Sequence, residues 1–140
     1  MTIIIDANKA IAGRLSAYAA KQAQNGEDVV VVNAEHAVIS GNATKISTKF
    51  KARRGIQNKG NPEHTIKWPR RPDLLLKKMI SGMVPKHAPA GKAALERIRV
   101  YLGVPKEFEG KAKKFEKTSD DLPCAFTTLS ELCRSVGWKK

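Results

Sequence analysis

Residues 28–34 read DVVVVNA, and their four consecutive valines are the strongest indicator of the fold in this chain. β-Branched residues favour extended backbone, and an apolar run without polar alternation is typical of a strand that is buried on both faces. Strands of this kind belong to parallel sheets whose two faces are covered. The stretch therefore predicts an inner strand of a parallel sheet, and so an α/β protein.

The segments on the amino-terminal side of this strand complete a βαβ unit. A short β-branched run, TIII at residues 2–5, predicts a first buried strand. The alanine-rich run AIAGRLSAYAAKQAQNG at residues 10–26 has Ile11 and Leu15 at helical spacing and ends at an Asn-Gly dipeptide, which stops helices. Strand, helix and strand in this order form a right-handed crossover between two parallel strands.

Downstream of the valine strand, apolar spacing and turn residues predict four more helices. One of them, GKAALERIRVYLG at residues 91–103, has apolar residues three and four positions apart, among them Ile98. The last helix begins at a capping box formed by Thr128 and Glu131. The remaining two helices are expected at residues 43–54 and 73–83, with a loop at residues 55–71 between them and an exposed arm of alternating charge at residues 106–121.

The charge of the chain is unevenly distributed along the sequence. The 140 residues fit a single domain over residues 1–140, and their formal net charge is +13. Residues 1–44 hold three cations and four acids, and residues 100–140, which include a charged arm and C-terminal helix at 106–140, hold eight cations and six acids. The basic segment 45–99 holds fifteen cations and three acids, a net charge of +12. A surface built only for solubility intersperses its signs, so this asymmetry predicts a binding surface for a polyanion, above all a nucleic acid.

The seventeen-residue loop at 55–71 is long for a compact domain, which favours a functional role, and its second half lies in the stretch HTIKWPRRP at residues 64–72. This stretch holds three cations, one tryptophan, two prolines and no acid. The prolines keep the backbone extended, which lowers the entropy lost on binding, and each arginine can fork onto a phosphate. Two roles are open for Trp68, because a tryptophan between helices is commonly core but an exposed indole stacks on bases. No base-reading helix is recognisable, so structured RNA is a better target than duplex DNA.

Other classes of site lack their sequence patterns. Residues 6–13 lack the glycine spacing of a dinucleotide site, and residues 55–61 lack the lysine and hydroxyl residue that end a P-loop. The three histidines are far apart, which argues against a metal site, and no nucleophile motif is recognisable. Cys124 and Cys133 are expected to be reduced thiols of a cytosolic protein. No apolar run approaches the roughly 20 residues of a membrane-spanning helix, and residues 1–10 do not read as a secretory signal.

Several motifs in a fixed order give the chain a specific resemblance. IIIDANKAIAGRLSAYAAK, VVVVNAE with ISG shortly after it, SGMVPK and RVYLGVP occur in this order and spacing over most of residues 3–105. Together they resemble the universal large-ribosomal-subunit protein family numbered thirteen, in its archaeal or eukaryotic branch. The resemblance implies a three-layer α/β/α fold with a small, mainly parallel four-stranded sheet and basic extensions. It also implies a structural protein without catalytic activity or cofactor.

The resemblance further implies binding to large-subunit ribosomal RNA early in subunit assembly, contacts with neighbouring large-subunit proteins, and a location on cytoplasmic ribosomes. The family's Gly-Arg-Leu motif matches Gly13, Arg14 and Leu15, which makes Arg14 a candidate RNA contact at a helix start. In the family's Gly-Met-Leu-Pro motif, Val84 stands in the place of the leucine.

Charge and resemblance together predict an RNA-binding constituent of the large ribosomal subunit, with no membrane, metal or small-molecule partner. The main alternative is a cytosolic enzyme that acts on a phosphorylated metabolite or nucleotide through the βαβ unit, and a second is a regulatory RNA binder outside the ribosome. The residues expected to contact RNA are Arg14, Lys49, Lys51, Arg53, Arg54, Lys59, Lys67, Arg70, Arg71, Lys86 and Lys92, with His64, Trp68 and His87 as secondary contacts.

Overall fold

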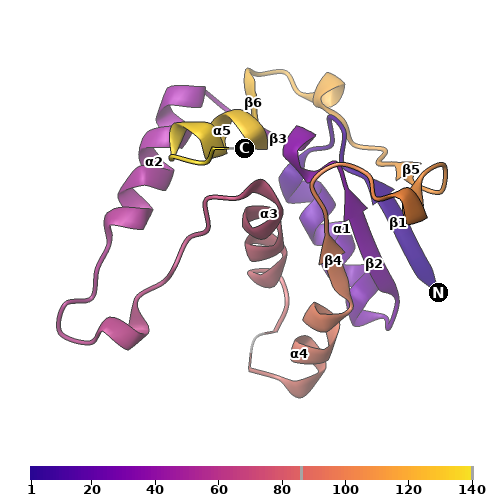
Figure 1. The fold of residues 1–140 in the computed structure, drawn as a ribbon, viewed down its shortest axis with the longest axis horizontal. Coiled ribbons are helices and arrows are strands. Elements are labelled where there is room, and N and C mark those ends of the chain that lie inside the picture. Colours follow the sequence, from indigo (N-terminus) through magenta and orange to yellow (C-terminus); the bar gives the residue numbers. More distant parts are fainter. Residues whose placement is uncertain (86, 140) are drawn as a thin grey trace.

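The computed structural model describes residues 1–85 and 87–139, and its centre is a four-stranded sheet (Figure 1). The strands lie in the order β4-β2-β1-β5, and every neighbouring pair is parallel. This confirms the predicted α/β class and its small parallel sheet. The strands are β1 (Thr2–Asp6), β2 (Asp28–Val32), β4 (Ile98–Val100) and β5 (Lys113–Lys114).

The described residues form five α-helices, three of which make one layer on the sheet. α1 contacts β2, α3 and α4, and α3 contacts β4. α2 and α5 contact each other beside a separate antiparallel pair of strands, β3 (Val38–Ser40) and β6 (Phe126–Thr128), which the sequence patterns did not predict. The helices are α1 (Ala12–Gln24), α2 (Ala43–Gly55), α3 (Pro72–Ser81), α4 (Pro89–Glu96) and α5 (Leu129–Ser135).

The valine strand β2 lies inside the sheet, as its composition predicts. Val31 pairs with Ile5 on one side and Val100 on the other, and Val31 and Ile5 join Leu15 of α1 in the main core. Val30, on the opposite face, is also buried. Because β2 is covered on both faces, every one of its valines is buried, which explains a continuous rather than alternating pattern.

The second face of the sheet is covered by a thin layer. β4 and β5 are the two edge strands, so the chain between them must cross the sheet, and it carries the 3-10 helix η3 (Lys106–Phe108). Phe108 lines the same surface hollow as Val30, and its ring centroid lies 5.9 Å from that of Tyr101. The layer opposite the α-helices is therefore a short 3-10 helix with its flanking loop.

The helix predicted at residues 91–103 is wrong in its second half. α4 ends at Glu96, and Ile98–Val100 forms β4. Ile98 is fully buried and Arg99 is exposed, which is the two-residue alternation of a strand. Pairing of this segment with β2 outweighs the helical spacing of its apolar residues, because tertiary contacts routinely override local preference.

The segment predicted as an exposed arm, residues 106–121, instead folds back along the sheet edge. Lys113 pairs with Ile5, and Lys114 pairs with Asp6. Ser119 of the 3-10 helix η4 (Ser119–Asp121) is buried, and its amide donates to the Lys9 carbonyl at 2.8 Å. Backbone groups make this edge pairing, so charged side chains can take part in it without an apolar signature.

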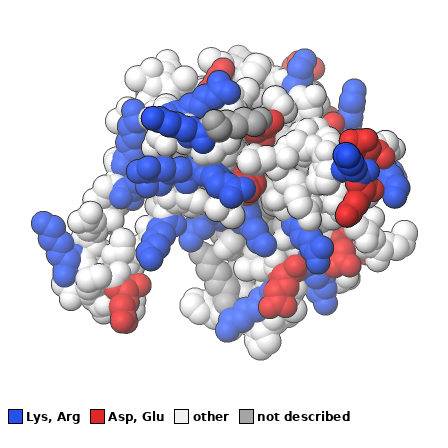
Figure 2. Space-filling model, viewed as in Figure 1, with Lys and Arg blue, Asp and Glu red and all other residues white. Residues whose placement is uncertain are grey.

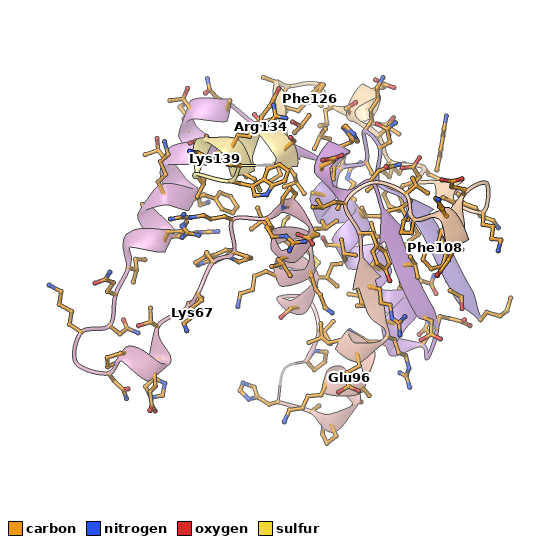
Figure 3. The ribbon with its side chains drawn as sticks, in the orientation of Figure 1. Lys67, Glu96, Phe108, Phe126, Arg134 and Lys139 are labelled. Carbon is orange, nitrogen blue, oxygen red and sulfur yellow. The ribbon has the colours of Figure 1, made fainter. Side chains whose placement is uncertain are left out.

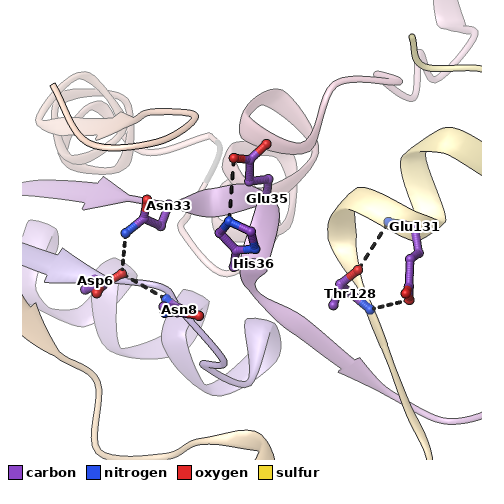
Figure 4. Close-up of polar contacts among 7 residues, drawn as sticks. All are labelled: Asp6, Asn8, Asn33, Glu35, His36, Thr128 and Glu131. Carbon is purple, nitrogen blue, oxygen red and sulfur yellow. Dashed lines mark hydrogen bonds and ion pairs between the residues drawn. The ribbon is translucent and has the colours of Figure 1, made fainter. Parts of the chain in front are cut away.

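Polar side chains hold the carboxyl ends of β1 and β2 together. Asp6 Oδ1 accepts hydrogen bonds from Asn8 N at 3.0 Å and from Asn33 Nδ2 at 2.8 Å (Figure 4). Asn33 has φ of 55°, a left-handed conformation that asparagine tolerates better than most residues. Internal hydrogen bonds thus fix the loops at the strand ends, where an α/β protein of another kind would hold a nucleotide.

The predicted capping box of α5 is confirmed (Figure 4). The Glu131 amide donates to Thr128 Oγ1, and the Thr128 amide donates to Glu131 Oε2, both at 3.2 Å. These bonds start α5 immediately after β6, which places the C-terminal helix against α2.

Candidate nucleic-acid interface

The most basic part of the structure is α2 together with the chain that returns from it, residues 43–71, which we call the basic arm. It holds nine cations and a single acid, Glu63. Figure 1 shows the arm extending away from the sheet, and Figure 2 shows Lys and Arg side chains massed on this side of the molecule. Red and blue side chains are more evenly mixed on the opposite side. The fold therefore keeps the basic segment together as one projecting surface.

Helix α2 presents a row of cations because it rests on the protein with one side only. Asn42 caps the helix by accepting a hydrogen bond from the Thr44 amide at 2.9 Å. Phe50 packs partly buried against the core, and the hydroxyls of Ser47 and Ser135 lie 2.8 Å apart, but no residue of α2 is fully buried. Lys45, Lys49 and Arg53 follow one another along the helix at four-residue spacing; Lys45 and Lys49 are exposed, and Arg53 is half-buried.

Trp68 ties the returning chain to α2. Its ring meets Phe50 edge to face at 5.8 Å, and the Arg53 guanidinium lies over the indole at 5.0 Å from the centroid. Arg54 Nη1 donates a hydrogen bond to the Trp68 carbonyl at 2.6 Å. Of the two roles left open by the sequence, this geometry supports the packing role. Contact of Trp68 with RNA stays a prediction.

The two arginines after Trp68 differ in whether an acid of the protein already pairs with them. Arg71 Nη2 lies 2.7 Å from Oδ2 of Asp73, the buried acid in the first turn of α3, so this cation is already paired within the protein. Arg70 is exposed and lies against Gly137, where an added Cβ would approach the guanidinium to 3.8 Å. The stretch 64–72 contains no acid, but its neighbour at position 73 neutralises one of its arginines. Arg70 is thus the arginine that remains available to an outside anion.

The distal part of the arm is exposed and polar. Lys59 and Lys67 are exposed, and so is His64 in the 3-10 helix η2 (Pro62–His64). Asn58 Nδ2 donates to the His64 carbonyl at 3.1 Å, which closes the tip of the loop. Lys51 is exposed nearer the base, where it lines a hollow of about 300 Å³ between α2 and α5.

The structure gathers ten of the predicted contact residues on the arm and leaves others elsewhere. His87 and Lys92 are exposed, before and on α4. Arg14 is exposed on α1, in a different surface patch that contains β5. Lys86 lies outside the described residues. The ten on the arm are Lys49, Lys51, Arg53, Arg54, Lys59, His64, Lys67, Trp68, Arg70 and Arg71.

Sequence reasoning missed three cations that belong with this surface. Lys45 shares the four-residue row of α2, and that spacing was available in the sequence. Figure 3 shows Arg134 on α5, the helix that contacts α2, and Lys139 in the chain that follows it. Because α5 reaches α2 only through the tertiary fold, no sequence pattern indicates that these two cations extend the basic surface.

The described residues offer no arrangement typical of catalysis by a metal or a thiol. No group of three or more metal-ligating His, Cys, Asp or Glu side chains occurs among them. Cys124 and Cys133 are both free thiols. Burial, assisted by the negative charge of Asp73, raises the pKa of the Cys133 thiol to about 12, so the reactive thiolate is scarce at neutral pH. Within the described part of the chain, no helix has the length and apolar character to cross a membrane.

Fold and surface together define a class, a small α/β protein with a projecting arm suited to a polyanion. A sequence model of the family "Ribosomal protein L13" matches residues 1–107, and the chain belongs to this family of ribosomal proteins. The predicted family is thereby confirmed. Because the family is structural rather than enzymatic, the prediction that the chain is no enzyme is confirmed as well, and the metabolite-enzyme alternative is set aside.

Relatives similar to nearly the whole chain are archaeal proteins named "Large ribosomal subunit protein uL13". The protein of Thermoplasma volcanium is 42% identical over 137 residues, which cover 96% of this chain and 97% of the relative. That of Methanocaldococcus jannaschii is 39% identical over 137 residues, covering 97% and 98%. That of Archaeoglobus fulgidus is 37% identical over 142 residues, covering 97% and 88%. The similarity thus extends past residue 107 into the C-terminal part.

Proposed function

We propose that this ribosomal protein is a structural constituent of the large subunit, binds large-subunit ribosomal RNA through the basic arm, and supports early subunit assembly. The observation that carries the proposal is the concentration of nine cations against one acid on an arm that projects from the sheet, whereas the other 111 residues hold seventeen cations and twelve acids. A charge excess of this kind raises self-repulsion in the folded protein, and a polyanion offsets it. The family and the names of its relatives point to ribosomal RNA as that polyanion.

The cations on the arm divide into those that bind and those that hold the arm in shape. Exposed Lys49, Lys59, Lys67 and Arg70 are free to meet phosphates, and each contact releases condensed counterions. Arg53 and Arg54 are partly engaged with Trp68, so they restrain the arm before RNA arrives. A restrained arm loses less conformational entropy on binding, which strengthens the complex without further contacts.

The remaining features of the proposal extend from the same surface. The chain acts as a single domain over residues 1–140, works on cytoplasmic ribosomes, and contacts neighbouring large-subunit proteins. Arg14, His87 and Lys92 contact RNA outside the arm. Similar proteins of large subunits, and the exposure of these three side chains, support this part of the proposal.

Two matched triple variants test the proposal in large subunits separated on salt-containing gradients. Replacing Lys49, Lys59 and Lys67 by Gln removes three exposed arm charges, whereas Lys21→Gln, Lys106→Gln and Lys111→Gln remove three exposed charges elsewhere. The arm variant is expected to leave the subunit at lower salt than wild type, and the control variant at nearly the wild-type salt concentration. Release of both variants at the same salt concentration would contradict binding through the arm.

A further inference from the structure

A second basic surface lies at the opposite end of the molecule from the arm. A hollow of about 420 Å³ opens beside the edge strand β5 and helix α1, a volume in the range of ligand-binding clefts. Figure 1 places β5 and α2 at opposite ends of the long axis, so the two surfaces cannot serve one compact contact. Within its lining, Ile3, Ile4, Tyr18 and Phe115 supply apolar groups.

The fold sorts the charges around this hollow. Residues 106–121 contain five cations and five acids, so the segment is neutral in sequence. Yet Lys113, Lys114 and Lys117 line the hollow together with Arg14, and of the five acids only Glu116 does. Pairing of β5 with β1 brings the segment that carries the three lysines to the hollow that Arg14 also lines, from more than ninety positions away. Four cations and one acid line the hollow together with apolar side chains. This lining complements a ligand that has anionic groups at its periphery and an apolar centre.

Two aromatic rings line the hollow: Tyr18 is exposed, and Phe115 is partly buried against the core. The centroids of Tyr18 and Phe115 lie 5.7 Å apart with the ring planes tilted by 57°. Tyr18 is 39% exposed although it is a large aromatic residue. Exposed aromatic rings surrounded by cations are the usual means by which proteins bind unpaired nucleotides, since the rings stack on bases and the cations meet phosphates.

We propose that this hollow receives an unpaired nucleotide of ribosomal RNA, with the base against Tyr18 and Phe115 and the adjoining phosphates on Arg14, Lys113, Lys114 and Lys117. The inference rests on the proposed function and extends it, because the protein then holds two RNA segments at opposite ends. The three lysines follow residue 107, where the match to the family's sequence model stops. The site therefore combines a matched helix, α1, with a segment outside that match.

A peptide strand is the competing occupant of this hollow. β5 pairs only with Ile5 and Asp6, so within the described chain the residues Thr2–Ile4 have no strand partner on that side of the sheet. An open strand edge can accept an extended peptide. The excess of cations and the exposed Tyr18 ring favour the nucleotide, because backbone pairing with a peptide needs neither of them.

The identity of the occupant is tested by photo-crosslinking in purified large subunits. The photoreactive residue p-benzoylphenylalanine replaces Tyr18, whose exposed ring position tolerates the exchange, and the attached molecule is identified after irradiation. Attachment to ribosomal RNA at an unpaired nucleotide is the expected result. Attachment to a protein, or to nothing within the subunit, would overturn the proposal.

A third triple variant separates failure of this inference from failure of the proposed function. Lys113→Gln, Lys114→Gln and Lys117→Gln together are expected to make the log–log salt dependence of binding to ribosomal RNA shallower by about 2–3 relative to the Lys21, Lys106 and Lys111 control. If the arm variant changes the slope and this variant does not, the second site is wrong and the arm still binds RNA. If neither variant changes it, both proposals fail. Circular dichroism verifies that these exposed substitutions leave the fold intact.

Discussion

The valine strand β2 and the basic arm differ in burial and in charge. In β2 all four valines are buried, and residues 1–44 around it are close to neutral. In the arm, α2 has no fully buried residue, and nine cations face a single acid. Folding free energy and binding charge therefore reside in different residues. Core substitutions should therefore change stability with little effect on intrinsic RNA affinity, and substitutions of the exposed cations of the arm should do the reverse.

The largest expected change in stability comes from the core helix α1. Leu15 is fully buried against the sheet, so Leu15→Ala is expected to lower the free energy of unfolding by about 2–5 kcal/mol. Urea denaturation measures this change. The salt dependence of RNA binding by the folded fraction should stay at its wild-type value, and a shallower salt slope would show that core and arm are not separable.

A smaller effect is expected where the arm meets the core. Trp68→Ala removes the edge-to-face contact with Phe50 and the cation–π contact with Arg53, and it is expected to cost about 1–3 kcal/mol of stability. Because the arm loses its restraint, RNA affinity should fall as well. Trp68→Phe, which keeps an aromatic ring, should restore part of both. Unchanged amide exchange in α2 of the alanine variant would argue against Trp68 as the restraint.

The next smaller loss of stability is expected at the cap of α5, the helix that contacts α2 of the arm. Thr128→Ala removes the hydroxyl that accepts from the Glu131 amide, and the expected loss is about 1 kcal/mol. Thermal unfolding measures it, and Thr128→Ser is the matched control that keeps the hydroxyl. Equal midpoints for Ala and Ser would show that the capping box contributes nothing.

At neutral pH the smallest effect on stability is expected from the two thiols. Cys124 is exposed and Cys133 is buried, so a thiol reagent at pH 8 should label one cysteine per native chain and two after denaturation. Because the folded pKa of Cys133 is about 12 and the ordinary value is 9.0, the unfolded chain loses this proton first as pH rises. Stability should therefore decline between about pH 9 and pH 12. Cys133→Ser should weaken that decline, and the same pH profile in both proteins would contradict the pKa shift.

The sequence was most informative where one local pattern dominates. Consecutive valines predict β2, alanine-rich helical spacing predicts α1, and Thr128 with Glu131 predicts the start of α5. Each of these signals arises from burial or hydrogen bonding within a few residues. Proline and cation content likewise indicates a projecting basic segment.

The features that the sequence did not predict are those whose structure is determined by tertiary contacts. Residues 98–100 lie in a segment whose apolar residues have helical spacing, yet they pair with β2 as a parallel strand. Residues 113–114 are lysines that pair through backbone alone, so nothing apolar marks them. Likewise, Lys113, Lys114 and Lys117 line one hollow with Arg14 only because the tertiary fold places β5 beside β1. Local sequence patterns carry no information on such proximity between distant segments.

The salt dependence of binding to purified large-subunit ribosomal RNA tests the separation of stability and binding most directly. Wild type, the Lys49, Lys59 and Lys67 variant and the Lys21, Lys106 and Lys111 control are titrated across a range of salt, and their unfolding free energies are measured in parallel. The arm variant should have a log–log slope shallower by about 2–3, from about 0.7–0.9 per lost phosphate contact, with wild-type stability. Equal slopes for the arm variant and the control would contradict the assignment of RNA binding to the basic arm.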